Sequence, residues 1–384
     1  MSLDKNFLHY GMHDISQLKI KDLKKSLNNQ ILTNDKFCNR LEKKISKITK
    51  SKYSVVCNNG TSALMMTILA KNDDKLIAIV PNINFVAIAN IITLLKGKIV
   101  LCDINPNTGM VDIDTFKKIL NLCRKKKIKP NLFFPVHYAG NVMELKKLKK
   151  ICNREKIDII EDGCHSFGSH DNEGNMVGNS KYSLGTTFSF HPVKNITTIE
   201  GGAITTNNKA FYKKLKIVRS HSLIRTNLED PYSLDSPSLN FRMGEINALI
   251  GLQQLTKLNS FMKKRHNIVK YYIKKFRNLK KYFKILNHNK KRTFWHLFVI
   301  LLNTKFKINK RDFMEFLKKN KIGSQIHYKP IFLHEQFKKS ILLSDNKNSI
   351  DFYKSQLSLP LHVHIRKKDV DYIYNVFSKY FSKL

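Results

Sequence analysis

Short apolar runs alternate with helix-length stretches from Tyr53 to about residue 162. The runs are rich in valine and isoleucine, which is typical of strands that are buried within a sheet. The predicted strands are Tyr53–Cys57, Leu76–Val80, Ile99–Asp103, Leu132–Val136 and Ile157–Asp162. The predicted helices between them are Thr61–Ala70, Phe85–Leu95, Ile113–Cys123 and Val142–Arg154. Such repeated strand–helix units predict an α/β fold with a mostly parallel sheet and helices on both faces.

The rhythm changes after Gly244. A long helical stretch, Glu245–Phe276, is followed by mixed elements. These are the predicted strands Phe294–Leu302 and Ser324–Tyr328 and the predicted helices Lys310–Asn320 and Lys368–Phe381. The pattern predicts a large domain over residues 1–244 and a smaller α+β domain over residues 245–384. Roughly the first 30 residues could pack on the smaller domain.

The composition is that of a globular protein, with 42% hydrophobic and 10% aromatic residues among 384. No apolar run reaches ~20 residues, so no membrane insertion is expected. The N-terminal segment, Met1–Asn6, lacks the basic and apolar parts of a signal peptide. The six cysteines are scattered and form no C-x-x-C pair, which argues against a zinc site or a disulfide framework. A cytoplasmic protein without a structural metal is expected.

The charge is unusual, because the chain contains 69 Lys and Arg residues and only 29 Asp and Glu residues, which gives a formal net charge of +40. One interpretation is a polyanionic partner, such as nucleic acid or an anionic membrane. Another is attraction for an anionic substrate, and a third is a lysine-rich composition without a function. The positive charge is spread along the chain, and no nucleic-acid-binding module is recognisable. No specific nucleic-acid partner is therefore expected.

Lys194 stands apart from the other lysines, because apolar and small residues flank it in Phe188-Ser-Phe-His-Pro-Val-Lys-Asn-Ile-Thr-Thr-Ile-Glu-Gly-Gly202. Upstream, the apolar run that begins at Ile157 ends in Asp162. A sheltered lysine and a buried carboxylate at a strand end suit pyridoxal 5′-phosphate (PLP). The lysine would form a Schiff base with the cofactor, and the aspartate would hold the pyridinium nitrogen protonated.

Three further motifs fit this chemistry. The turn Asn58–Ala63 closes a strand and opens a helix, so it could bind a phosphate, although ordinary helix caps look alike. His165 follows Asp162 closely and could approach the cofactor ring or simply pack in the core. Ser189 could place a hydroxyl on the phosphate or merely face a loop. Each motif is weak alone, and their order and spacing together favour a PLP site.

These motifs resemble the DegT/StrS-type family of sugar-nucleotide aminotransferases. The resemblance begins at Tyr10 and covers nearly the whole chain. The lysine motif, the Glu161-Asp162-x-x-His165 group and His327-Tyr328-Lys329-Pro330 carry it most specifically. Two positions depart from the family pattern: Asn34-Asp35 replaces a glycine turn, and Asn84 stands where threonine is common.

The resemblance implies a PLP-dependent transferase fold of the aspartate-aminotransferase type, assembled as a homodimer with shared active sites. It also implies roles for individual residues. Lys194 would be the Schiff-base lysine and the base of the 1,3-proton shift, and Asp162 would hold the ring nitrogen. The remaining roles are cofactor contacts for Thr61, Ser62, Phe85, His165, Ser189 and Asn240, the last from the other subunit, and substrate contacts for Arg242, His327, Tyr328 and Lys329.

The expected reaction is transfer of an amino group, from L-glutamate, to C4 of a UDP-linked 4-keto-6-deoxy-N-acetyl hexose, with 2-oxoglutarate as co-product. A related transaminase that serves lipopolysaccharide or lipid A, or acts on a dTDP-sugar, is an alternative. A non-catalytic PLP-binding protein or a polyanion-binding protein belongs to a different class. The intact Lys194 and Asp162, and the absence of an appended DNA-binding domain, argue against that class.

Overall fold

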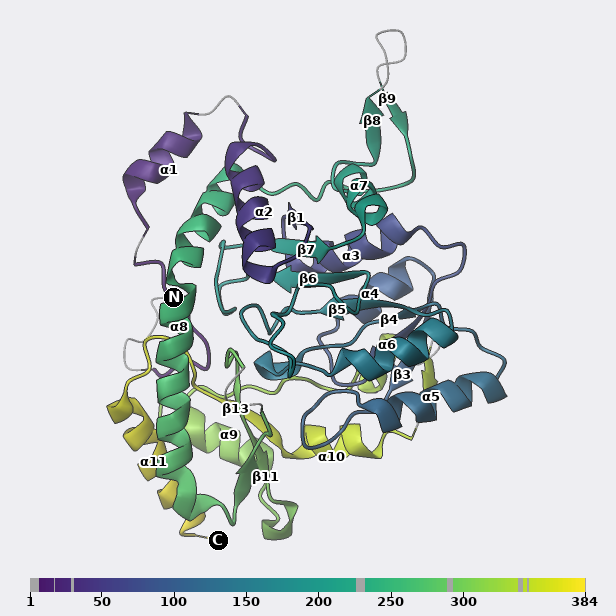
Figure 1. The fold of residues 1–384 in the computed structure, drawn as a ribbon. Coiled ribbons are helices and arrows are strands. Elements are labelled where there is room, and N and C mark those ends of the chain that lie inside the picture. Colours follow the sequence, from purple (N-terminus) through teal and green to yellow (C-terminus); the bar gives the residue numbers. More distant parts are fainter. Residues whose placement is uncertain are drawn as a thin grey trace.

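A large open sheet forms the centre of the molecule (Figure 1). The structure is a computed structural model that describes residues 7–16, 18–28, 31–225, 232–288, 293–337, 341–343 and 345–383. The prediction made for Met1–Asn6 therefore lies outside the described residues. The sheet has the order β1-β7-β6-β5-β4-β2-β3-β12. Its strands are β1 (Tyr53–Cys57), β2 (Ile77–Pro81), β3 (Lys98–Cys102), β4 (Leu132–Phe133), β5 (Asp158–Asp162), β6 (Gly185–Ser189), β7 (Gly202–Thr206) and β12 (Ile341–Leu343).

All pairings in this sheet are parallel except those of β7, which runs antiparallel to β1 and to β6. The prediction of a mostly parallel α/β sheet is confirmed. Alternate strand residues enter two different cores, as the period of two requires. In β2, Ile79 packs with the helices α5 and α6, while Ala78 and Val80 pack with α3 and α4. Helices therefore cover both faces.

The helices of this part begin and end close to the predicted bounds where a prediction existed. They are α1 (Ile20–Leu27), α2 (Lys36–Thr49), α3 (Gly60–Lys71), α4 (Ala87–Leu94), α5 (Ile113–Lys125), α6 (Leu145–Arg154) and α7 (Lys209–Val218). The helices α1, α2 and α7 were not predicted. In α2 the apolar positions Phe37, Leu41 and Ile45 recur at helical spacing, so the signal was present.

The strand predicted over Leu132–Val136 is shorter than expected. The described strand β4 ends at Phe133, because Pro135 has no N–H to continue the ladder. The carbonyl of Pro135 instead accepts the N–H of Asp162, and Val136 forms a single bridge to that residue. This pairing fixes the loop after β4 against the end of β5.

The long helix α8 (Glu245–Lys275) begins directly after the predicted domain boundary, yet it packs on both cores. Its first half packs on the large domain through Leu249 and Leu255, and its second half packs through Tyr272 on a second core. That core belongs to the smaller unit, which contains β10 (Phe283–Ile285), β11 (Phe298–Leu302), β13 (Gln356–Leu359), α9 (Lys310–Lys319) and α11 (Lys367–Phe381). Helix α10 (Lys347–Ser355) returns to the large core through Phe352. The division at residue 244 stays a prediction.

The strand predicted over Ser324–Tyr328 is wrong. The segment forms one isolated bridge, of Gln325 with Ser358, and Ile322 just before it forms another with Leu8. These two bridges lead to different partners, β13 and the N-terminal segment, so no continuous ladder forms. The segment instead forms part of the wall of a large cavity, which Gln325 and Tyr328 both line.

Candidate active site

A cavity of about 610 Å³ lies at the carboxyl ends of the parallel strands, where the 325–328 segment meets the large sheet. Ligand sites of open α/β sheets gather at this edge. The cavity contains Lys194, Asp162 and His165 together. Its other lining residues are Tyr10, Asn59, Gly60, Thr61, Leu64, Asn84, Phe85, Ala87, Val136, Cys164, Ser189, His191, Val193, Glu200, His296, Gln325, Ile326, His327 and Tyr328.

Lys194 lies on the loop between β6 and β7, where its backbone N–H donates to the carbonyl of His191 at 2.9 Å. The side chain is half-buried on the cavity wall. Burial lowers the pKa of the Lys194 amine, and the neighbouring Cys164 and Asp162 oppose this effect. A lowered pKa increases the fraction of neutral amine, which is the form that can attack a carbonyl carbon.

Asp162 is the last residue of β5 and is buried, with 7% of its surface exposed. Its Oδ1 accepts the backbone N–H of Cys164 at 3.0 Å, which fixes the carboxyl group at the strand end. Burial, followed by the Asp162 carboxylate, raises the pKa of the Cys164 thiol well above its usual value. The thiol is therefore protonated at neutral pH and unsuited to act as a nucleophile.

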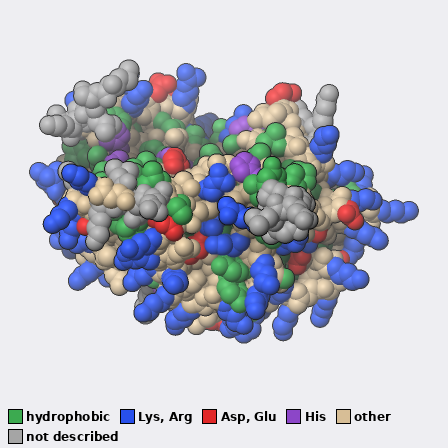
Figure 2. Space-filling model, turned by 90° about the horizontal axis from the view of Figure 1, so that it is seen from above, with side chains coloured by type: hydrophobic (Ala, Val, Ile, Leu, Met, Phe, Trp, Pro, Cys, Tyr) green, Lys and Arg blue, Asp and Glu red, His purple; other side chains and the backbone are tan. Residues whose placement is uncertain are grey.

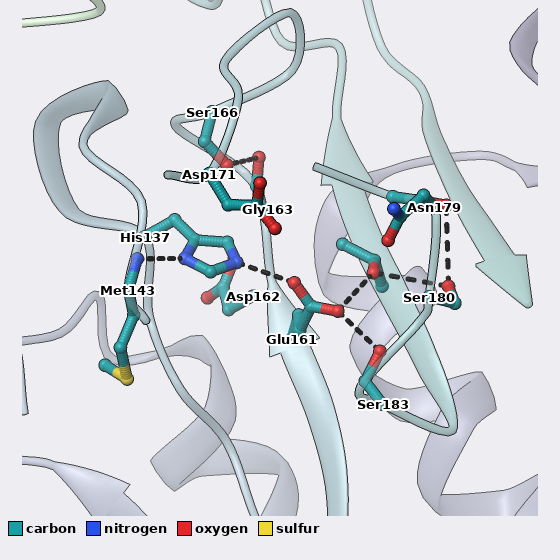
Figure 3. A network of polar contacts seen from close by, with 12 residues as sticks. His137, Met143, Glu161, Asp162, Gly163, Ser166, Asp171, Asn179, Ser180 and Ser183 are labelled. Atoms are coloured by element: carbon teal, nitrogen blue, oxygen red, sulfur yellow. Dashed lines mark hydrogen bonds and ion pairs between the residues drawn. The ribbon is translucent and has the colours of Figure 1, made fainter. Parts of the chain in front are cut away.

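The adjacent carboxylate, Glu161, points to the opposite side of β5, as the alternation of a strand requires. Figure 3 shows it between His137 and Ser183. Its Oε2 lies 2.8 Å from His137 Nε2, and its Oε1 accepts hydroxyl hydrogen bonds from Ser183 and Thr186. Because Met143 N–H donates to His137 Nδ1 at 3.1 Å, Nε2 carries the ring hydrogen and donates to Glu161. This buried network ties the ends of β4, β5 and β6 together behind Asp162.

The N-terminus of α3 forms the part of the site suited to an anion. Asn59 caps this helix, its Oδ1 accepting the N–H of Ser62 at 2.7 Å. The N–H groups of Gly60 and Thr61 precede the intrahelical ladder, and both residues line the cavity with Ser189. A Cβ atom at Gly60 would lie 2.7 Å from the Cβ of Ser189, so only glycine allows this approach of helix and strand. The arrangement suits a phosphate.

An aromatic wall closes the other side of the cavity. Phe85 is 54% exposed, and the centroid of its ring lies 5.6 Å from that of Tyr328. The exposed face of the Phe85 ring is therefore available for a planar ligand. His165 and His327 are buried. Burial, and then the charge of Lys194, lowers the pKa of His327 to about 3 and that of His165 well below its usual value. Both rings are therefore neutral at pH 7, and His327 could meet a substrate anion only as a neutral hydrogen-bond donor.

Four predicted residues do not line this cavity: Ser62, Asn240, Arg242 and Lys329. Ser62 is buried, and its N–H is used by the cap of α3. Asn240 and Lys329 are exposed outside the cavity. The Oδ1 of Asn240 accepts the N–H of Arg242 at 3.1 Å. The roles of these residues stay predictions.

Tyr10 and His296 are among the lining residues to which the sequence interpretation gave no role. Tyr10 arrives from the N-terminal segment, whose Leu8 pairs with Ile322. His296 is 4% exposed, and its Nδ1 has no hydrogen-bond partner within the described part of the chain. In the sequence, His296 is a single histidine within the otherwise apolar run Phe294–Leu302. A histidine that merely packs in the core would give the same pattern.

The residues of the cavity fit PLP. Lys194, whose pKa is lowered, suits the aldehyde of this cofactor, and the buried carboxylate of Asp162 suits its ring nitrogen. The helix N-terminus at Gly60, with the hydroxyl of Ser189 beside it, suits the phosphate. Lys194, Asp162, Thr61 and Ser189 would hold the cofactor, with Phe85 and His165 beside its ring.

Among the residues that the structure describes, no helix is long and apolar enough to cross a membrane.

The positive charge does not gather at one place on the face shown in Figure 2. Lys and Arg side chains are distributed over this face and its rim, among few Asp and Glu side chains. A nucleic-acid-binding surface normally has its basic residues on one patch or stripe. The distribution on this face gives no support to a polyanion-binding surface.

The comparisons with known proteins agree with the geometry of the site. The model of the DegT/DnrJ/EryC1/StrS aminotransferase family matches residues 13–378. A Campylobacter jejuni protein named UDP-4-amino-4,6-dideoxy-N-acetyl-beta-L-altrosamine transaminase is 32% identical over 364 residues, 95% of each chain. The structure of Helicobacter pylori PseC, described as an aminotransferase involved in the biosynthesis of pseudoaminic acid, superposes with a TM-score of 0.89 at 28% identity and covers 98% of this chain and 100% of that one.

A third similar structure carries information on the cofactor. It is a putative sugar aminotransferase from Streptococcus pneumoniae in its PLP-form, with a TM-score of 0.86 and 25% identity, covering 98% of this chain and 99% of that one. The same protein has also been solved in a PMP-form.

Proposed function

The chain belongs to the DegT/DnrJ/EryC1/StrS aminotransferase family, and we propose that it binds PLP and aminates C4 of a UDP-linked 4-keto-6-deoxy-N-acetyl hexose, with L-glutamate as donor. The observation that carries this proposal is the meeting of Lys194, Asp162 and the N-terminus of α3 in one cavity. Relatives named as transaminases of a UDP-linked amino sugar support the choice of substrate. Such a product suits biosynthesis of the pseudaminic acid type.

The roles follow from the local environments. When bound, PLP supplies an electron sink that stabilises the carbanion formed at the amino donor. Asp162 would keep the ring nitrogen protonated, because its buried carboxylate favours a positive charge beside it. Lys194 Nζ would remove the proton from the α-carbon of the amino donor. It would then deliver this proton to the cofactor carbon that is bonded to the same nitrogen. The N-terminus of α3 and Ser189 would hold the phosphate.

The substrate class leaves close alternatives. A relative named dTDP-4-amino-4,6-dideoxy-D-glucose transaminase is 26% identical over 90% of the chain, so a dTDP-linked ketosugar remains an alternative. A lipopolysaccharide or lipid A precursor is a further one. All are anionic, and the high positive charge of the chain would attract any of them. Charge therefore does not discriminate among these substrates.

The function is tested by incubating the PLP-loaded protein with L-glutamate and a panel of UDP- and dTDP-linked 4-ketosugars. The products are identified by mass spectrometry and NMR. The expected result is a 4-amino product from the UDP-linked N-acetyl hexose at the highest kcat/KM, with 2-oxoglutarate formed in equal amount. Amination of a dTDP-sugar alone would move the proposal to the alternative substrate, and no aminated product would contradict it.

A homodimer with shared sites is part of the proposal. The hairpin β8 (Leu223–Arg225) and β9 (Tyr232–Leu234) projects from the body of the molecule (Figure 1). It exposes 60% of Tyr232 and 68% of Leu234. Nearby in sequence, Leu239 is 53% exposed beside Asn240. Exposed apolar side chains in such number favour burial against a second copy.

The shared site predicts complementation between inactive chains. Lys194→Ala chains mixed with Asn240→Ala/Arg242→Ala chains should regain activity after subunit exchange, because one cavity of each heterodimer contains only native residues. Activity is measured on heterodimers isolated through two different tags. Verified heterodimers without activity would show that Asn240 and Arg242 serve their own subunit.

A cytoplasmic location is likewise proposed. The six cysteines are all free, although five of them are buried and could not meet an oxidant readily. Free cysteines are typical of a reducing compartment. Cell fractionation tests the proposal, and enrichment outside the cytosolic fraction would contradict it.

A further inference from the structure

Tyr328 and His165 form a hydrogen-bonded pair across the cavity. Tyr328 belongs to the 325–328 segment of the smaller unit, and His165 follows β5 of the large sheet. The hydroxyl oxygen of Tyr328 lies 2.9 Å from His165 Nε2. The two rings are nearly parallel, with an interplanar angle of 30° and centroids 5.9 Å apart. Both residues line the cavity that contains Lys194.

The direction of this hydrogen bond follows from the other nitrogen of the imidazole. The backbone N–H of Ala139 can only donate, and it points at His165 Nδ1 in a long hydrogen bond of 3.4 Å. Burial lowers the pKa of His165 well below its usual value, and the charge of Lys194 lowers it further. In a neutral ring whose Nδ1 accepts, Nε2 carries the hydrogen. His165 therefore donates to the hydroxyl oxygen of Tyr328.

The hydrogen of the Tyr328 hydroxyl is then free for another acceptor. Within the part of the chain that the structure describes, His165 Nε2 is the only hydrogen-bond partner of this hydroxyl. Burial raises the pKa of Tyr328 well above its usual value, so the hydroxyl remains protonated over the working pH range. A buried hydroxyl normally finds a partner for its hydrogen. A ligand in the cavity can supply that acceptor.

We propose that Tyr328 donates a hydrogen bond to the ketone oxygen of the amino acceptor, and that His165 positions Tyr328 for this contact. The inference rests on the proposed function. The reacting carbonyl must come within reach of Lys194, and Lys194, His165 and Tyr328 line the same cavity. The Tyr328 hydroxyl is held 2.9 Å from His165 Nε2 within this cavity, so a carbonyl that reaches Lys194 enters the space that Tyr328 lines.

The ketone oxygen is the substrate atom that a hydrogen-bond donor would stabilise most, because negative charge develops on it during the reaction. As the amine nitrogen bonds to C4, the π electrons of the C=O bond move to the oxygen. Both hydrogens of the amine end on that oxygen, which leaves as water while the C=N bond forms. A fixed, neutral donor at this oxygen stabilises the developing negative charge and keeps its own proton throughout. The account requires no oxidant or other co-reactant.

The first test separates the two half-reactions in Tyr328→Phe, which keeps the ring and loses only the hydroxyl. The half-reaction with L-glutamate, followed by 2-oxoglutarate release, is expected to stay near the wild-type rate. The half-reaction with the 4-ketosugar should slow by about 10²-fold, the typical effect of removing one such donor. Tyr372→Phe is the matched control, because its hydroxyl donates to the Asn320 carbonyl on an exposed surface. It should leave both half-reactions unchanged.

The second test measures binding and not turnover. Calorimetry on the PLP-loaded protein compares the UDP-linked 4-ketosugar with its 4-deoxy analogue. Wild-type protein should bind the analogue about 10-fold more weakly, because the Tyr328 hydrogen loses its acceptor. In Tyr328→Phe the two ligands should bind about equally. Discrimination that survives in Tyr328→Phe would overturn the assignment.

The positioning role of His165 is tested with two variants in the same binding assay. His165→Gln can accept from Ala139 N–H and donate to Tyr328, so it should retain part of the discrimination between the two ligands. His165→Leu can do neither and should lose it. Equal discrimination in the two His165 variants would show that His165 has a merely structural role. An equal slowing of both half-reactions in Tyr328→Phe would show the same for Tyr328. If the wild-type protein aminates no nucleotide sugar, the proposed function fails, and this outcome is distinct from the others.

Discussion

Lys194→Ala is expected to lower the rate of amino transfer by at least ~10³-fold, because it removes both the group that bonds to the cofactor and the base that moves the proton. The variant should still fold and still bind PLP non-covalently, since Asp162, Thr61 and Ser189 line the same cavity independently of Lys194. The rates are measured at saturating PLP, glutamate and 4-ketosugar. Added alkylamine should restore part of the activity by replacing the missing base.

Lys209→Ala is the matched control for this prediction. Lys209 is exposed at the first turn of α7, away from the cavity, and carries the same charge. Its substitution should leave kcat and KM unchanged. A Lys194→Ala protein within ~10-fold of wild-type turnover would show that another group performs the proton transfer.

Asp162→Asn is expected to lower turnover by about 10²–10³-fold while the fold is maintained. The amide oxygen can still accept the N–H of Cys164, so the loop after β5 should keep its geometry. The amide lacks the negative charge that holds the cofactor nitrogen protonated, so the carbanion is stabilised less well. The measurement is kcat at saturating PLP, with the melting temperature as a check on folding.

Asp158→Asn is a control on the same strand. Asp158 begins β5, at the end opposite the cavity, and its carboxylate pairs with Lys71 at 2.7 Å. Loss of such a half-exposed ion pair costs about 0–1 kcal/mol and should not affect turnover. Equal effects of the two substitutions on turnover would indicate that Asp162 acts through the stability of the strand.

Five of the eight strands of the large sheet, β1 to β5, could be predicted because they are short apolar runs, which can be recognised without knowledge of their partner strands. The strand Ile157–Asp162 and its terminal carboxylate were recognisable for this reason. The 324–328 segment was read wrongly, because its apolar residues Ile326 and Tyr328 serve a cavity wall and not a ladder. Local composition does not distinguish these two uses.

Part of the candidate site could be predicted from local sequence motifs. Lys194, Asp162 and the turn at Gly60 are each contained in a short stretch whose chemistry is visible in the sequence. Tyr10 and His296 were not accessible, because only the tertiary fold brings these distant segments to the cavity. The partner of Tyr328, and with it the direction of its hydrogen bond, likewise depends on a contact between residues 163 positions apart.

The central claim is that this cavity binds PLP through Lys194. It is tested most directly by borohydride reduction of the PLP-loaded protein, followed by proteolysis and mass spectrometry. The account predicts one stoichiometric pyridoxyl-phosphate adduct on the peptide that contains Lys194, and its loss in Lys194→Ala, although lysines abound elsewhere in this chain. A stoichiometric adduct on a different lysine, or no selective adduct at all, would contradict it.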